Sequence, residues 1–340
     1  MYEKLVTFEE EKRKEHLYLL FNSIFICACL MIIFETVFKF SLLLFSEIKN
    51  EEVKWFFTTL LSPLCMSGAV FFPFFIYNMR QETPLKGKLQ TSRGKASPFV
   101  YVCGIISVAA IVPILIHLGS LFCDFLVSRG YKINESVTDM GSSLPANIFF
   151  VLYTSAVSAI LVELALRGVV AEKLAYANTS LAIVLPALIS AMNTYSLFKI
   201  PYLFVTGLII SFFFLKTKSL YLAVVMNFAA NVVYDSVLLL RENSDLLTVS
   251  LISLLVAVVA FVVFANVKGF KIKYPEAKNS DEEYERLTKK EAFWGTFKSF
   301  AFWIFMFIFL FRLFLTYLDK PMPDPTNSDG PVQSETLIEE

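Results

Sequence analysis

Residues 98–127 read PFVYVCGIISVAAIVPILIHLGSLFCDFLV, a run in which Asp124 is the one side chain charged at pH 7 when histidine is counted as neutral. A helix needs about twenty mainly apolar residues to cross the hydrocarbon of a bilayer, so this run is long enough. It is too long and too uniformly apolar for the alternating pattern of a membrane β-strand, and lipid offers no partners to exposed backbone groups. The run therefore predicts a transmembrane α-helix.

Similar runs recur along the whole chain. Of its 340 residues, 56% are hydrophobic and 18% are charged, against roughly a quarter charged in an ordinary soluble domain. This composition excludes a soluble enzyme, a disordered chain and a disulfide-stapled domain. We predict an all-α fold, a polytopic transmembrane helix bundle of about nine helices. The predicted segments are 17–45, 55–79, 98–127, 147–169, 180–198, 201–215, 219–240, 246–267 and 294–318.

The placement of lysine and arginine predicts how these helices are oriented. Cytoplasmic loops of membrane proteins are enriched in both residues. With the predicted helices, one side of the membrane receives 20 of the 30 basic residues and the other side receives 7. We therefore expect an integral protein of a bacterial plasma membrane, with a cytoplasmic N-terminus and an external C-terminus. Because 30 basic and 30 acidic residues cancel, nucleic acid is not expected as a partner.

The segments between and after the helices define the expected domain organisation. The C-terminal residues are rich in proline, serine and acid, a composition typical of a disordered tail. Trp55 and Trp294 fall at ends of the second and ninth segments, and tryptophan prefers the headgroup level there. The expected parts are a cytoplasmic N-terminus (1–16), three N-terminal transmembrane helices with their loops (17–146), an intramembrane core (147–240), two C-terminal helices with a charged cytoplasmic linker (241–318) and a disordered acidic tail (319–340).

Polar side chains inside the predicted helices are the candidates for function, because hydrocarbon penalises each one that lacks a partner. Glu163 and Arg167 lie four residues apart in VELALRGVVAEKL, so a helix places them on one face. Asn227 and Asn231 have the same spacing in MNFAANVVYD, and Asn193 lies in the fifth segment.

At these residues the chain resembles the CAAX-protease and bacteriocin-processing family, called CPBP or Abi, whose intramembrane core carries EExxxR, FxxxH and HxxxN on successive helices. VELALRGVVAEKL is similar to the family's EELLFRG segment. PYLFVTGLIISFFFLKTKSLYLAVVMNFAAN is similar to its later block, with Gly207, Ser211 and the closing Asn231. The resemblance covers about residues 147–240 and implies a CPBP-like core there.

The chain departs from the family pattern at the three principal catalytic positions. In the family the first Glu of the pair activates the attacking water, and here that position is Val162, beside the retained Glu163 and Arg167. The HxxxN histidine is Asn227, and the fifth segment holds no histidine for FxxxH. Valine cannot take a proton and asparagine cannot shuttle one, whereas each general acid or base contributes about a hundred- to ten-thousand-fold.

The remaining residues suggest no metal and no cofactor. His16 and His117 are the two histidines of the chain, and the predicted helices place neither of them near Glu163. A histidine-ligated zinc site needs more ligands than these. No glycine-rich nucleotide loop is present, and the five cysteines form no CxxC pair, so no disulfide is predicted.

Three functions remain open from the sequence. The first is a non-catalytic CPBP homologue, a pseudoprotease that acts as a membrane scaffold and binds a membrane or cell-envelope protein. The alternative is an active intramembrane glutamate-type endopeptidase of prenylated or other membrane peptides, with Glu163 as base and Asn193 and Asn227 as oxyanion donors. The second alternative is a small-solute transporter, for which a continuous polar path across both leaflets would be expected.

The motif residues are predicted to meet in space. A buried pair of Glu163 and Arg167 would lock the fourth helix against the fifth and seventh, and we favour this structural role over catalysis. Glu35 and Lys39, four apart in the first helix, predict a local ion pair of their own. The residues expected to form one interhelical polar cluster are Glu163, Arg167, Asn193, Asn227 and Asn231.

Overall fold

The structure, a computed structural model, describes residues 2–46, 53, 56–80, 97–129, 144–194, 196–240, 246–268 and 289–318. Among these residues every regular element is a helix and none is a strand, so the all-α fold is confirmed. Within the same ranges, 7 helices are long and apolar enough to cross a membrane. Two shorter apolar helices, Thr179–Met192 and Phe300–Phe314, account for the other two predicted segments. The chain is an integral membrane protein built as a polytopic helix bundle.

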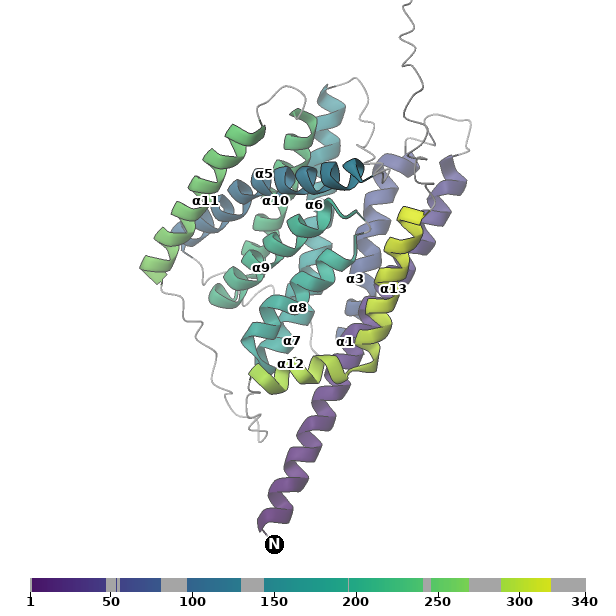
Figure 1. The fold of residues 1–340 in the computed structure, drawn as a ribbon, viewed down its shortest axis with the longest axis vertical. Coiled ribbons are helices and arrows are strands. Elements are labelled where there is room, and N and C mark those ends of the chain that lie inside the picture. Colours follow the sequence, from purple (N-terminus) through teal and green to yellow (C-terminus); the bar gives the residue numbers. More distant parts are fainter. Residues whose placement is uncertain are drawn as a thin grey trace, which may run out of the picture.

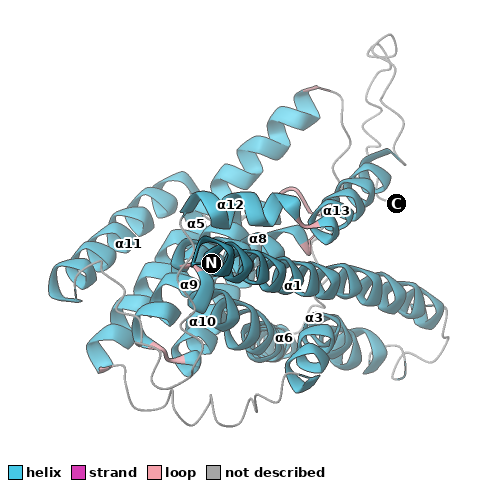
Figure 2. Ribbon diagram, turned by 90° about the horizontal axis from the view of Figure 1, so that it is seen from below, coloured by secondary structure: helices cyan, strands magenta, loops and turns pink. Residues whose placement is uncertain are grey.

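Helices from both ends of the chain form one side of the bundle (Figure 1). The long α1 (Tyr2–Ser46) packs against α3 (Ser62–Arg80), which continues from the π-helix η1 (Phe56–Leu61). On its other flank α1 packs against α13 (Phe300–Leu318), and the short α12 (Lys289–Lys298) contacts α1 as well. The first and last helices therefore lie side by side (Figures 1 and 2).

The other side of the bundle is the core that the sequence singled out. A continuous helical run starts with α6, bends through a π-helical turn η2 and ends in α7, and α3 packs against α6. Next come α8 and α9, which pack against each other, and then α10, which packs against α6. The bounds of these elements are α6 (Leu144–Ala165), η2 (Leu166–Ala171), α7 (Glu172–Ala177), α8 (Thr179–Met192), α9 (Lys199–Thr217) and α10 (Leu220–Leu240).

Two helices outside this core cover one of its edges. The helix α5 (Pro98–Ser128) contacts α9, α10 and α11 (Leu246–Lys268). Ser250 of α11 donates a hydrogen bond to the carbonyl of Pro113 in α5, at 3.0 Å. This hydrogen bond links α11 to α5, and polar contacts of this kind help to hold helices together in lipid.

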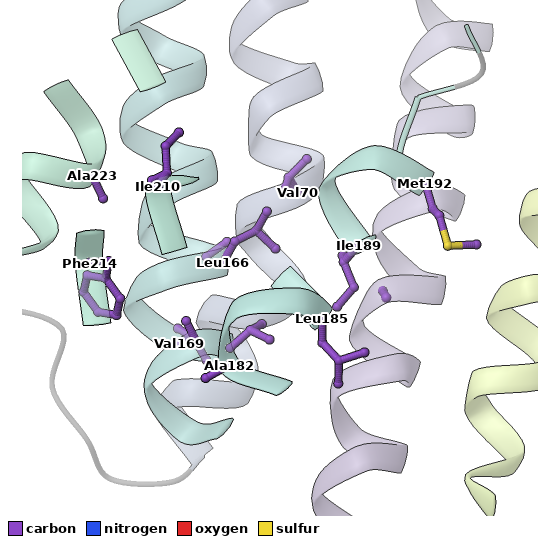
Figure 3. Close-up of a cluster of buried hydrophobic side chains, with 14 of the residues drawn as sticks. Val70, Leu166, Val169, Ala182, Leu185, Ile189, Met192, Ile210, Phe214 and Ala223 are labelled. Atoms are coloured by element: carbon purple, nitrogen blue, oxygen red, sulfur yellow. The ribbon is translucent and has the colours of Figure 1, made fainter. Parts of the chain in front are cut away.

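The π-helical turn η2 is wholly buried. Its flanking residues Ala165 and Glu172 keep α-helical backbone angles, so the helix runs on without a break from α6 to α7. Figure 3 shows Leu166 and Val169 of this turn among apolar side chains of neighbouring helices. Isolated π-turns within α-helices often mark functional sites. The neighbours drawn there include Val70, Ala182, Leu185, Ile189, Ile210 and Phe214.

Three of the predicted core segments have other bounds in the structure, and the first of them, 147–169, continues through η2 and α7 to Ala177. The predicted segment 180–198 is α8, which ends at Met192 because the Thr194 hydroxyl accepts the Ser196 N–H at 3.2 Å and turns the chain. Asn193 therefore follows the helix instead of lying within it. The predicted segment 201–215 is longer than expected, since α9 has 19 residues and is one of the candidate spans.

The last predicted segment, 294–318, is two helices. Ser299 separates α12 from α13, and its hydroxyl accepts the N–H of Phe302 at 3.3 Å, which caps the start of α13. Trp294 therefore lies within α12, not at the end of a transmembrane helix. The predictions for Trp55, for most of the charged linker and for the tail at 319–340 concern residues outside the described ranges.

Candidate functional site

Glu163 and Arg167 form an ion pair in the interior of the bundle. The Arg167 Nη1 atom donates to Glu163 Oε1 at 2.8 Å, across the junction between α6 and η2. Glu163 is 0% exposed and Arg167 is 1% exposed. An unpaired charge in this position would cost several kcal/mol, roughly, so each side chain is stabilised by the other. The pairing that the four-residue spacing predicted is confirmed.

Two further helices contribute to the same pair. Arg167 Nη2 donates to the carbonyl oxygen of Gly207 in α9, at 2.9 Å. Asn227 of α10 donates from Nδ2 to Glu163 Oε1, at 2.6 Å. The carboxylate oxygen Oε1 of Glu163 thus receives donors from its own helical run and from α10. We call Glu163, Arg167, Gly207 and Asn227 the central cluster, and it joins three helices.

Gly207 allows α9 to approach its neighbours closely. A Cβ atom at this position would lie 3.0 Å from both the Cα and the Cβ of Ala187 in α8, and 3.3 Å from Arg167 Nη2. Small residues at helix contacts in membranes permit such close backbone approach. The contact brings the Gly207 carbonyl within reach of the guanidinium, so a backbone group serves as the second partner of Arg167.

Some polar atoms in and near the central cluster have no partner among the described residues. They are Glu163 Oε2, Arg167 Nε and the hydroxyl of Ser211, which lies one helical turn after Gly207 in α9. Buried polar groups are normally hydrogen-bonded, and such exceptions call for an explanation. A carboxylate oxygen and a guanidinium N–H together offer one acceptor and one donor to a small polar group.

Asn231 and Asn193 do not join the central cluster. Asn231 Oδ1 accepts the hydroxyl of Tyr202 at 2.7 Å, which makes a separate link between α10 and α9. The backbone carbonyl of Asn193, just after α8, accepts from Arg312 Nη1 of α13 at 3.2 Å. The expected cluster is therefore wrong for these two residues: the Asn231 side chain bonds to Tyr202 instead, and Asn193 Oδ1 is buried with no hydrogen-bond partner among the described residues.

The expected arrangement of helices around the pair also needs correction. The central cluster ties the fourth predicted helix to the sixth and seventh, through Gly207 and Asn227, and the fifth contributes apolar contact through Ala187. Val162, beside the pair in sequence, is partly buried and packs against the hydrophobic core.

Neither histidine belongs to the central cluster as described. His117 lies in α5, and its carbonyl accepts the hydroxyl of Ser120 at 2.8 Å. The side chain of His16 lies outside the described part of the structure. Across the described residues, no group of three or more His, Cys, Asp or Glu side chains is placed to hold a metal ion.

A second ionic cluster, which sequence reasoning missed, joins the outer helices. Arg312 Nη1 of α13 donates to Glu35 Oε2 of α1 at 2.9 Å, closer than the 3.7 Å between Glu35 Oε1 and Lys39 Nζ. The predicted pair of Glu35 and Lys39 is confirmed, but the better partner of Glu35 is 277 residues away in sequence. The signal available beforehand was that Arg312 is a charged residue inside an apolar run.

Comparison with known families finds a match for the segment that contains the central cluster. Residues 144–233 match the family model described as type II CAAX prenyl endopeptidase Rce1-like. These residues form an Rce1-like domain. The Rce1-like domain runs from the start of α6 into α10 and contains all four residues of the central cluster. No curated protein and no solved structure gives a significant match to the chain.

Proposed function

We propose that this Rce1-like membrane protein is a pseudoprotease, a non-catalytic CPBP homologue that serves as a membrane scaffold and binds a membrane or cell-envelope protein. The observation that carries the proposal is the hydrogen bonding of Glu163. Its Oε1 atom accepts from both Arg167 and Asn227, so the polar groups of the site bond mainly to one another. These hydrogen bonds stabilise three helices against one another.

The residue beside Glu163 supports the same conclusion. Hydrolysis of a peptide requires a base that deprotonates water and donors that hold the oxyanion and protonate the leaving amine. The family resemblance puts the activating carboxylate at Val162, whose side chain has no atom that takes a proton and instead packs on the apolar core. Losing one such group lowers a rate by about a hundred- to ten-thousand-fold.

The hydrogen bonding of Asn227 also supports a non-catalytic role. By the resemblance this position carries a histidine in the family, and an amide donates hydrogen bonds without exchanging a proton with substrate. Here the donor Nδ2 is directed at Glu163 Oε1, at 2.6 Å, and not away from the cluster. Arg167 is similarly engaged by Glu163 and by the Gly207 carbonyl.

One observation favours the alternative, an active glutamate-type endopeptidase of prenylated or other membrane peptides. The second oxygen of Glu163, Oε2, has no hydrogen-bond partner within the described residues. A carboxylate with one oxygen held and the other free is oriented to accept a proton from a bound water. This alternative assigns Glu163 as the base.

A peptidase assay separates the two functions. The full chain is reconstituted in liposomes and given a prenylated peptide and its unprenylated counterpart. Wild type and Glu163→Gln are expected to show the same background rate. Asp124→Asn, which changes an exposed carboxylate of α5, is the matched control. Turnover by wild type that Glu163→Gln abolishes and Asp124→Asn leaves intact would refute the pseudoprotease and establish the alternative.

The scaffold half of the proposal has its own test. Wild type and Glu163→Gln are purified in mild detergent from the native membrane, and the co-purifying membrane proteins are identified. Glu163→Gln keeps a side-chain oxygen that can accept from Arg167 and Asn227, so a partner held by the scaffold is expected with both, compared at equal amounts of folded protein by circular dichroism. A protein that accumulates only with the Glu163→Gln variant would behave as a trapped substrate and would argue against the scaffold.

A further inference from the structure

The chain bends at Ser299, between α12 and α13, and we call this bend the elbow. It gives α12 a different direction from α13. Figure 1 shows α12 lying across the lower part of the bundle, whereas α13 runs along α1, and Figure 2 shows α12 again from below, next to α1 and α13. A helix that lies across a membrane bundle at one end does not continue the transmembrane path.

The elbow is held rigidly by α1. Ser299, which is wholly buried, donates from its hydroxyl to Asn22 Oδ1 at 2.7 Å, and the same oxygen accepts the N–H of Ala301 at 3.3 Å. In α12 a Cβ atom at Gly295 would lie 3.0 Å from the Phe21 ring, so the two helices are in close contact. The orientation of α12 is therefore fixed by α1.

The outward face of α12 combines basic and aromatic side chains. Residues spaced three, four and eight positions apart share one helical face. Thr296 and Ser299, on the opposite side, are buried against the bundle. Lys290 and Lys298 are exposed and form no ion pair with the described residues. The outward residues are Lys290, Phe293, Trp294 and Lys298.

This face continues into a purely apolar one on α13. Phe300 is 70% exposed and Phe307 is 68% exposed, while no charged residue occurs between Phe300 and Phe311. Exposed phenylalanine on a membrane helix faces the hydrocarbon. The basic side chains stop at Lys298 and do not recur before Arg312, so we place the boundary between headgroups and hydrocarbon near Ser299.

We propose that α12 is an interfacial helix that binds anionic phospholipid headgroups through Lys290 and Lys298. Tryptophan suits the level of the headgroups, where Trp294 would lie. An interfacial helix buries apolar side chains such as Phe293 at the boundary with the acyl chains. Lysine attracts anionic lipid, and each basic residue near such a surface raises affinity about fivefold. The rigid elbow holds both lysines toward the same leaflet.

Depth-dependent fluorescence quenching tests the placement. The chain has 3 tryptophans, Trp55, Trp294 and Trp303, so the Trp55→Phe, Trp303→Phe variant reports Trp294 alone. The full-length variant is reconstituted in vesicles that contain lipids brominated either near the headgroup or deep in the acyl chain. Stronger quenching by the shallow bromines is expected. Equal lack of quenching by both would place α12 off the membrane and overturn the proposal.

Lipid selectivity is tested in the same vesicles. Quenching by brominated phosphatidylglycerol is expected to exceed quenching by brominated phosphatidylcholine several-fold, with about 25-fold as the upper bound for two lysines. Lys290→Gln with Lys298→Gln should remove this preference, whereas Arg129→Gln, an exposed cation at the end of α5, should not.

Two further experiments identify which anion causes the lipid preference. Added inorganic phosphate should leave the preference unchanged; its loss would mean that a free anion occupies the site and would refute lipid binding. Native mass spectrometry of the lysine variants in the wild-type tryptophan background counts retained phosphatidylglycerol independently of the fluorescent variant. Equal retention by wild type and Lys290→Gln, Lys298→Gln would also refute the proposal.

Discussion

Replacing Arg167 by leucine should be among the most destabilising single changes in the core. It removes the contacts of the guanidinium with Glu163 Oε1 at 2.8 Å and with the Gly207 carbonyl at 2.9 Å. Glu163, at 0% exposure, is left with the Asn227 amide as its hydrogen-bond donor. Removing one partner of a buried ion pair costs about 3–5 kcal/mol, because the other charge stays buried without compensation.

The double variant Glu163→Leu, Arg167→Leu should be much milder than the two single variants together. The single losses add up to about 6–10 kcal/mol. The double variant buries no charge and leaves the Asn227 amide and the Gly207 carbonyl short of a partner, at about 0.6–2 kcal/mol for each lost hydrogen bond between membrane helices. The expected coupling between the two residues is therefore about 2 kcal/mol or more.

A double-mutant cycle measures this coupling in lipid or detergent. Reversible unfolding of wild type, both single variants and the double variant is followed by circular dichroism as denaturing detergent is added. Glu35 and Lys39 supply the matched cycle, with the same four-residue spacing but a 3.7 Å contact and a lysine side chain that is 29% exposed. That cycle should give a coupling below about 1 kcal/mol. Additive losses for Glu163 and Arg167, within about 0.5 kcal/mol, would refute the reasoning.

Two other predictions concern packing and topology. Gly207→Ala places a Cβ 3.0 Å from the backbone of Ala187 and should lower stability by about 1–3 kcal/mol, whereas Gly68→Ala, whose Cβ would meet only the Phe72 ring at 3.1 Å, should change it by less than about 1 kcal/mol in the same unfolding assay. Equal effects would show that α8 can move away from α9. For topology, a cysteine introduced at Ser334 of a cysteine-free chain should react with an impermeant reagent in intact cells. Reaction only after the cytoplasmic side is opened would mean that the helix count is wrong by an odd number.

The sequence predicted the elements that depend on composition and short spacing. Long apolar runs predict helices because lipid leaves a chain few other ways to pair its backbone groups. The pair of Glu163 and Arg167 was predictable because residues four apart face each other on a helix. The Rce1-like segment was predictable because its motifs are local in sequence.

What the sequence could not predict depends on backbone atoms and on distant contacts. The carbonyl of Gly207 is an acceptor that every residue possesses, so nothing in the sequence marks it as the partner of Arg167. The residue types of the π-helical turn Leu166–Ala171 also occur in ordinary α-helices, so the sequence does not reveal the turn. The contact between Glu35 and Arg312 spans 277 residues, and only the packing of α1 against α13 brings them together.

The position of Arg312 links the outer helices to the proposed function. The last carbonyls of a helix lack intrahelical partners and carry the negative end of its dipole, so a cation bound just after α8 stabilises that end. Arg312 supplies this cation to the Asn193 carbonyl while Glu35 neutralises it, which ties α13 and α1 to the Rce1-like domain.

By the resemblance to the CPBP family, the FxxxH histidine should lie between Asn193 and Phe198, just after α8. In an active enzyme that histidine would serve as a hydrogen-bond or proton donor to the substrate. In this chain the stretch instead anchors a helix from outside the domain. An anchored α13 supports a scaffold, because it fixes an added membrane face relative to the core.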